Sequence, residues 1–135
     1  MVQTMTTGLF QITTGSHLLE EAAKAQEISF LTFKDIHNKT EFLKEIAKKL
    51  HFPSYFEANW DALYECLTDL TWLDTEGVVL FFEDCPSFYK KHFEDFQGMI
   101  SVLKAVVEHW KSRSKIFSLY FKDFPDLGLG APSTL

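Results

Sequence analysis

The sequence lacks the features of several protein classes. Its two cysteines, Cys66 and Cys85, sit in apolar surroundings without neighbouring metal-type ligands, so we expect reduced core thiols and neither a disulfide framework nor a zinc site. No apolar run approaches the roughly 20 residues that span a bilayer. Residues 1–8 also lack the basic and apolar regions of a signal peptide. We therefore expect a soluble, cytoplasmic protein with no membrane contact.

Basic residues are absent from one long window. From Leu50 to Tyr89 there is no lysine or arginine, and the remainder of the chain carries 13 basic and 11 acidic residues. The formal net charge of −6 is thus concentrated in this window, which argues against direct nucleic-acid binding, because such binding rests on lysine and arginine. The eight acidic residues of the window are Glu57, Asp61, Glu65, Asp69, Asp74, Glu76, Glu83 and Asp84.

Apolar and aromatic residues are plentiful. The 135 residues are 46% hydrophobic and include 14 phenylalanines and 3 tryptophans, which is enough for one domain with a single core. The division we expect is an N-terminal extension at 1–27, a domain at 28–124 and a flexible tail at 125–135, where glycine and proline are frequent.

Alternating apolar and helical patterns predict an α/β fold. Strands separated by helices require crossover connections, which indicates a small parallel sheet packed with helices. Residues 9–12 and 16–25 are candidates for a fourth strand and a further helix. The three short apolar runs that predict strands are Ile28–Phe33, Val78–Phe82 and Ile116–Phe121.

Three helices follow from apolar spacing. Asn38 is a candidate N-cap with Glu41 at the capping-box position, ahead of a helix reaching Leu50. A second helix covers residues 59–69, and either Ser54 or Asn59 could cap it. The longest covers 93–111. The apolar positions that define these helices are Phe42, Ile46 and Leu50, then Trp60, Leu63 and Leu67, then Phe93, Phe96, Met99, Ile100, Val102, Leu103, Val106, Val107 and Trp110.

The second helix carries a row of acids. Asp61, Glu65 and Asp69 are four residues apart and share one face, and Glu57 extends the row just before or within the first turn. Such a stripe is commonly a solvated face, and like charges at this spacing cost a helix a few tenths of a kcal/mol.

Two features favour a binding surface instead of a solvated face. Tyr55, Tyr64 and Trp72 flank the row, and aromatic residues beside charges are typical of interface hot spots. No lysine is interleaved with the acids, as expected of a surface that meets a cationic cleft and associates by salt-sensitive steering.

The run Phe52-Pro53-Ser54-Tyr55-Phe56-Glu57-Ala58-Asn59-Trp60-Asp61-Ala62-Leu63-Tyr64-Glu65-Cys66-Leu67-Thr68-Asp69 resembles the signature of the barstar family, inhibitors of barnase-type ribonucleases. The resemblance implies a three-layered α/β domain whose second helix and preceding loop plug the active site of a small basic ribonuclease, with no cofactor. It implies partner contacts at Tyr55, Asn59, Asp61, Tyr64 and Glu65, to which the acidic row adds Glu57 and Asp69. Glu108 is a weaker match to a further acidic contact.

Some residues depart from the family pattern and bear on the identity of the partner. Glu65 replaces an aspartate, Tyr64 replaces a tryptophan, and Glu57 occupies a position where the best-known family member has glycine. Each change alters the shape or the charge of the plug.

Other functions remain open at this point. Paired carboxylates such as Asp61 and Glu65 could serve an enzyme, but nothing in the sequence marks a pocket around them. The histidines make no metal-binding pattern. The stronger alternative is a module of the same fold that binds another cationic protein or associates with itself.

Overall fold

The computed structural model describes residues 5–13, 16–83, 85–122 and 124. Four strands form one sheet in the order β1-β4-β3-β2, and every neighbouring pair is parallel. The three predicted strands are confirmed within about one residue at each end, and the N-terminal candidate is confirmed as the fourth strand. The strands are β1 (Gly8–Ile12), β2 (Ser29–Lys34), β3 (Gly77–Glu83) and β4 (Ile116–Lys122).

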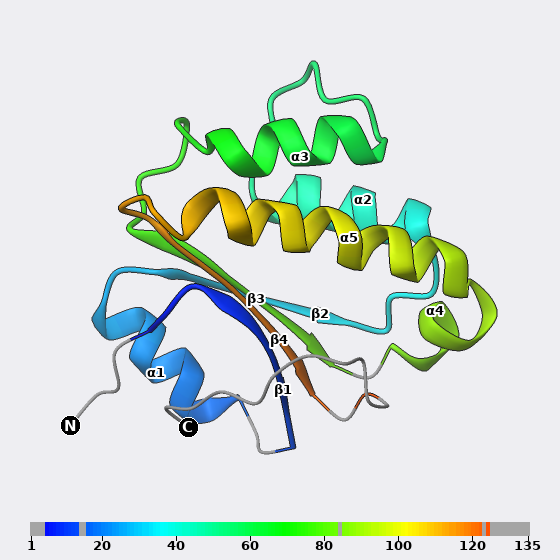
Figure 1. Ribbon diagram of the computed structural model, residues 1–135, viewed down its shortest axis with the longest axis horizontal. Coiled ribbons are helices and arrows are strands. Elements are labelled where there is room, and N and C mark those ends of the chain that lie inside the picture. Colours follow the sequence, from blue (N-terminus) through cyan, green and yellow to red (C-terminus); the bar gives the residue numbers. More distant parts are fainter. Residues whose placement is uncertain (1–4, 14–15, 84, 123, 125–135) are drawn as a thin grey trace.

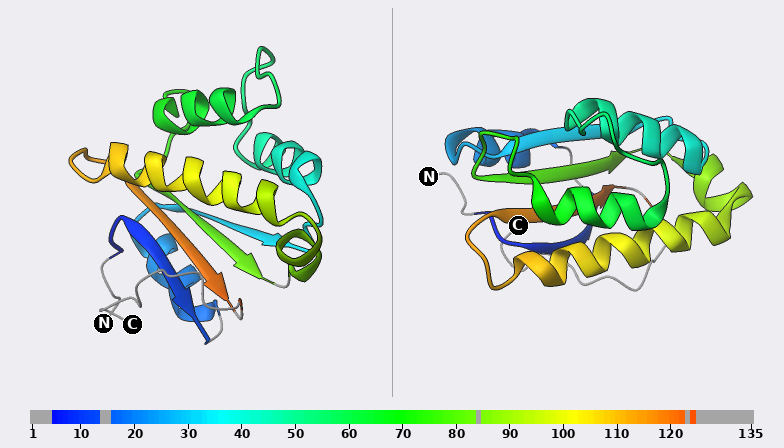
Figure 2. Two further views of the ribbon diagram at one scale, coloured as in Figure 1. Left: turned by 45° about the vertical axis from the view of Figure 1, so that its right-hand side comes forward. Right: turned by 90° about the horizontal axis from the view of Figure 1, so that it is seen from above.

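Helices cover both faces of the sheet and form three layers with it (Figure 1). One face packs against α1, and the other packs against α2 and α5, with α4 at one end (Figure 2). Helix α3 rests on α2 and α5 and lies farthest from the sheet. The helices are α1 (His17–Ala25), α2 (Lys39–Lys49), α3 (Trp60–Asp69), α4 (Pro86–Lys91) and α5 (Phe93–Trp110).

Strand β3 runs through the middle of the sheet and is buried on both sides, so successive side chains enter two different cores. Val79 and Phe81 join the smaller core beneath α1, whereas Val78, Leu80 and Phe82 join the larger core beneath α2 and α5. The helix and strand of the N-terminal extension therefore complete a second core rather than lengthening the first.

The cap of α2 differs in one detail from the expected capping box. Asn38 Oδ1 accepts from the Glu41 backbone N–H at 2.9 Å, as predicted. The Glu41 carboxylate, however, accepts from the backbone N–H of His37 at 2.7 Å, one residue before the cap. That hydrogen bond lowers the pKa of Glu41.

Two local features depart from the sequence pattern. Phe93, predicted to begin the apolar face of the long helix, is 45% exposed and makes an edge contact with Tyr89, with ring centroids 5.3 Å apart. Helix α4 was not predicted, because six residues are too few to show a helical period. Its start carries Pro86 at the first helical position, where proline is well tolerated.

Residues 125–135, predicted to be a flexible tail, lie outside the described residues, and the division at 27 and 28 stays a prediction. Cys66 and Cys85 are both buried and are not joined in a disulfide. Across the described residues, no helix combines the length and apolar character that crossing a membrane requires.

Candidate protein-binding surface

The predicted acidic row lies on the outermost element of the protein. Glu57, Asp61, Glu65 and Asp69 are all exposed, and we call these four residues the acidic ridge. The ridge follows α3 and the loop before it, which together project away from the sheet (Figure 1). A projecting helix of this kind suits a concave partner.

Asn59 decides where α3 begins. Its Oδ1 accepts from the backbone N–H of Ala62 at 2.8 Å, so Asn59 rather than Ser54 is the N-cap. Glu57 therefore belongs to the preceding loop and Asp61 to the first helical turn. Because the amide of Asn59 shapes the helix start, it holds the first part of the ridge in place.

The inner side of α3 holds the helix to the scaffold. Leu63 and Leu67 are fully buried and Cys66 is nearly so, which confirms the predicted core side. The indole N–H of Trp110 on α5 donates to the Leu67 carbonyl at 2.8 Å in a buried hydrogen bond. The helix that carries the ridge is thus held firmly against α5.

The ridge carboxylates lack cationic partners among the residues that the structure describes. Within the described part of the chain, no lysine, arginine or histidine forms an ion pair with the ridge carboxylates. Acids on neighbouring helices do find partners: Glu45 pairs with Lys49 at 3.5 Å. The ridge is therefore a concentrated, uncompensated negative surface.

Two tyrosines flank the ridge and a predicted third aromatic does not. Tyr55 is 70% exposed and Tyr64 is 38% exposed, so both can contact a partner. Trp72, by contrast, is half-buried, and its indole N–H donates to the Leu50 carbonyl at 2.8 Å. Trp72 belongs to the scaffold.

An aromatic cluster fixes the loop before α3. Phe52 contacts Phe56 edge-on with ring centroids 4.9 Å apart, and it meets Trp72 at 6.0 Å. The backbone N–H of Phe56 donates to the Pro53 carbonyl at 3.0 Å. Ordering the loop in advance lowers the entropic cost of binding, and it leaves Tyr55 directed to solvent.

Glu108 lies near the end of the ridge. Helices α3 and α5 run in the same direction (Figure 1), and the hydrogen bond from Trp110 brings the last turn of α5 to the last turns of α3. Glu108 is exposed but pairs with Lys111 at 2.8 Å. Glu108 therefore lies on the turn of α5 that reaches the end of α3, and it is already paired with a lysine.

Two titratable groups beside the ridge have shifted pKa values. Burial, followed by the charges of Asp69 and Glu65, raises the pKa of the Cys66 thiol, which keeps it protonated and unreactive at neutral pH. Burial also lowers the pKa of His109, more than its contact with the Thr68 backbone raises it. No group of three or more His, Cys, Asp or Glu side chains among the described residues is placed to hold a metal ion.

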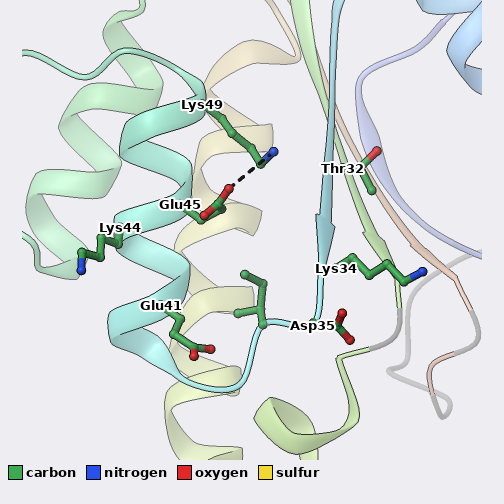
Figure 3. Close-up of a pocket in the computed structure, with 8 residues that line it drawn as sticks. Thr32, Lys34, Asp35, Glu41, Lys44, Glu45 and Lys49 are labelled. Atoms are coloured by element: carbon green, nitrogen blue, oxygen red, sulfur yellow. Dashed lines mark ion pairs between the residues drawn. The ribbon is translucent and has the colours of Figure 1, made fainter.

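A surface hollow of about 440 Å³ lies away from the ridge, between β2 and α2. Figure 3 shows Glu45 and Lys49 paired within it, while the Lys44 side chain points to the outer side of α2. Glu41 is engaged by the His37 backbone. Because Glu41 and Glu45 already have partners, this hollow offers less uncompensated negative charge to a partner than the ridge does.

The fold and the ridge define a small α/β protein with an all-parallel sheet and an exposed acidic helix. Residues 26–122 match the family described as Barstar (barnase inhibitor). The chain belongs to the Barstar family, so a role like that of a barnase inhibitor is supported at the level of the family. A comparison with curated protein sequences found no match.

The sequence analysis placed Trp60 on the apolar side of α3 but missed the residues against which it packs. Trp60 lies against Gly98 of α5, and the Lys39 ammonium stands 4.7 Å from the centroid of its ring. A glycine inside the long predicted helix was the available signal, because glycine is unfavourable there unless close packing requires it.

Proposed function

We propose that this protein inhibits a barnase-type ribonuclease by inserting the acidic ridge and the preceding loop into the cationic active site of the enzyme. A single observation carries the proposal: the most protruding helix presents a row of exposed carboxylates without cationic partners among the described residues. Membership of a family of barnase inhibitors supports the same role. In this proposal the protein acts by binding, without a cofactor and without catalysis.

The contacts we propose follow the exposed face of α3 and its loop. Asp61 and Glu65 enter the cleft and pair with its basic groups, and Tyr55 and Tyr64 pack on the rim. Glu57 and Asp69 extend the negative field along the cleft. Asn59 supports the helix start, and Glu108 lies at the edge of the contact. The partner is a small basic ribonuclease in the cytoplasm, and the protein contacts this enzyme directly, without nucleic acid between them.

Electrostatics makes the proposal specific. A row of like charges accelerates association with a cationic cleft, and salt screens that effect. Charged hot spots that become buried in an interface each contribute about 2 kcal/mol or more on truncation, or roughly a 30-fold change in affinity. Glu65→Ala and Asp61→Ala should both reach this size while leaving the fold intact.

The decisive experiment is inhibition of a panel of barnase-type ribonucleases by the purified protein at low and high salt. We expect stoichiometric, salt-sensitive inhibition that Glu65→Ala and Asp61→Ala weaken. The matched control is Glu20→Ala on α1, an exposed glutamate on the opposite side of the sheet. It changes the net charge equally but leaves the ridge untouched.

Two outcomes would contradict the proposal. If no panel member is inhibited, the ridge serves a different cationic protein or self-association. If inhibition occurs but Glu20→Ala weakens it as much as Glu65→Ala, net charge rather than the ridge is responsible.

A further inference from the structure

Gly98 is a helix-interior glycine with a packing reason. It is the sixth residue of the 18-residue helix α5 and lies inside the helix, beyond its first turn, where glycine is among the least favourable residues. A Cβ atom at this position would stand 2.9 Å from Trp60 Nε1 and 3.3 Å from Trp60 Cε2. The Trp60 indole therefore occupies the space in which a side chain at position 98 would lie.

Trp60 joins three helices at the beginning of the ridge. It is the first residue of α3 and follows the Asn59 cap. Its ring lies against Gly98 of α5 and near Phe42 of α2, with ring centroids 6.3 Å apart. Lys39 of α2 adds a cation–π contact at 4.7 Å.

The two ends of α3 are each held by a tryptophan. At the end of α3, Trp110 donates its indole N–H to the Leu67 carbonyl. At the start, the Trp60 ring lies against Gly98 of α5. Asp61 is the next residue along the chain, so a displacement of the Trp60 backbone carries Asp61 with it.

We propose that Trp60 and Gly98 are positioning residues for the acidic ridge, and that their close approach sets the height at which Asp61 and Glu65 meet the partner. This inference rests on the proposed function. Carbon atoms in contact normally stand about 3.5–4.0 Å apart, so an added Cβ moves the indole by roughly 0.5–1 Å. Binding residues must be held within about 0.5 Å of their productive positions, so this shift is large enough to matter.

A double-mutant cycle tests the proposal. The variants are Gly98→Ala, Trp60→Phe and the pair, and the measurement is the dissociation constant for a ribonuclease that the wild type inhibits. Gly98→Ala should weaken binding about tenfold or more, a loss of the size that a misplacement near 1 Å can cause. In the Trp60→Phe background the same change should cost less than about threefold, because phenylalanine lacks the pyrrole ring that the Cβ would strike.

Controls separate positioning from general destabilisation. Ser101→Ala, at an exposed position of the same helix, should leave affinity unchanged. Affinities are compared at a temperature where urea titration shows every variant fully folded. If Gly98→Ala fails to fold, adding Trp60→Phe should restore folding, and failure to restore it overturns the proposal. Equal losses of affinity in the two backgrounds overturn it as well.

A partner-free measurement distinguishes this inference from the proposed function. Gly98→Ala should shift the indole N–H resonance of Trp60 and the backbone amide resonances of Asp61 and Glu65 in ¹H–¹⁵N spectra. The amide shifts should shrink in the Trp60→Phe background. If the wild type inhibits no ribonuclease but these shifts occur, the proposed function fails and the positioning device stands. Unmoved ridge amides refute the device whatever the partner is.

Discussion

Neutralising one ridge carboxylate should stabilise the free protein. Glu65 lies four residues from both Asp61 and Asp69 on the same helix, and no cation among the described residues pairs with it. Each like-charge pair at this spacing costs about 0.2–0.5 kcal/mol. Glu65→Gln removes both repulsions with almost no change in helix propensity. The free energy of unfolding should therefore rise by about 0.4–1 kcal/mol.

Urea denaturation at two salt concentrations measures this effect. Residues four apart are separated by about 6 Å along the helix axis. Their repulsion persists at 0.05 M salt and is strongly screened near 1 M, where the Debye length is about 3 Å. The gain from Glu65→Gln should therefore be largest at low salt. The variant should also bind the ribonuclease more weakly, so stability and affinity move in opposite directions.

Glu45→Gln is the matched control. Glu45 lies on α2, pairs with Lys49 at 3.5 Å and stands four residues after Glu41, so the same chemical change removes one attraction and one repulsion of similar size and should alter stability by less than about 0.5 kcal/mol. The reasoning is refuted if Glu65→Gln destabilises the protein, or if its gain is as large at 1 M salt as at 0.05 M.

Three further predictions concern the scaffold. Leu63 is fully buried, so Leu63→Ala should cost about 2–5 kcal/mol in urea denaturation; a cost below 1 kcal/mol would mean that α3 is rotated. A Cβ on Gly77 would stand 2.4 Å from the Ile116 carbonyl oxygen, so Gly77→Ala should lower the thermal midpoint by forcing β3 from β4, and an unchanged midpoint would refute this. Burial raises the pKa of Tyr120 from 10.0 to about 12. The contribution of the buried neutral tyrosine to the free energy of unfolding is therefore complete below pH 10. It is lost as pH rises to 12, because only the unfolded chain ionises at Tyr120 in that window. Over that window the urea midpoint of the wild type should fall further than that of Tyr120→Phe, and equal falls would contradict the assignment.

Much of the fold was accessible from the sequence because local patterns dictate it. The continuous apolar run from Val78 to Phe82 required burial on both faces, and that is its place in the sheet. Asn38 and Asn59 both cap helices, since their side chains can accept from the first turn.

The predictions that failed did so because tertiary packing, which the sequence alone does not show, decided the outcome. Phe93 fits the helical period but lies beyond the edge of the core and is exposed. The sequence predicted Trp72 as an interface aromatic, but its indole N–H donates to the Leu50 carbonyl inside the scaffold. No spacing rule states that α3 and α5 run in the same direction, so the placement of Glu108 near the end of the ridge required the structure. The site residues themselves remain predictions until a partner is measured.

The pairing of the first strand with the last has a consequence for the order of folding. Gly8 pairs with Ser118 and Ile12 with Lys122, so β1 has no strand partner in the sheet until β4, about 110 residues later, has been synthesised. Long-range pairings of this kind form late, because closing the large loop costs entropy before any contact is gained. We expect β1 to dock last, and pulse-labelled hydrogen exchange should show its amides protected after those of β3. The first strand made is thus the last to be placed, and the ridge can form before the sheet is complete.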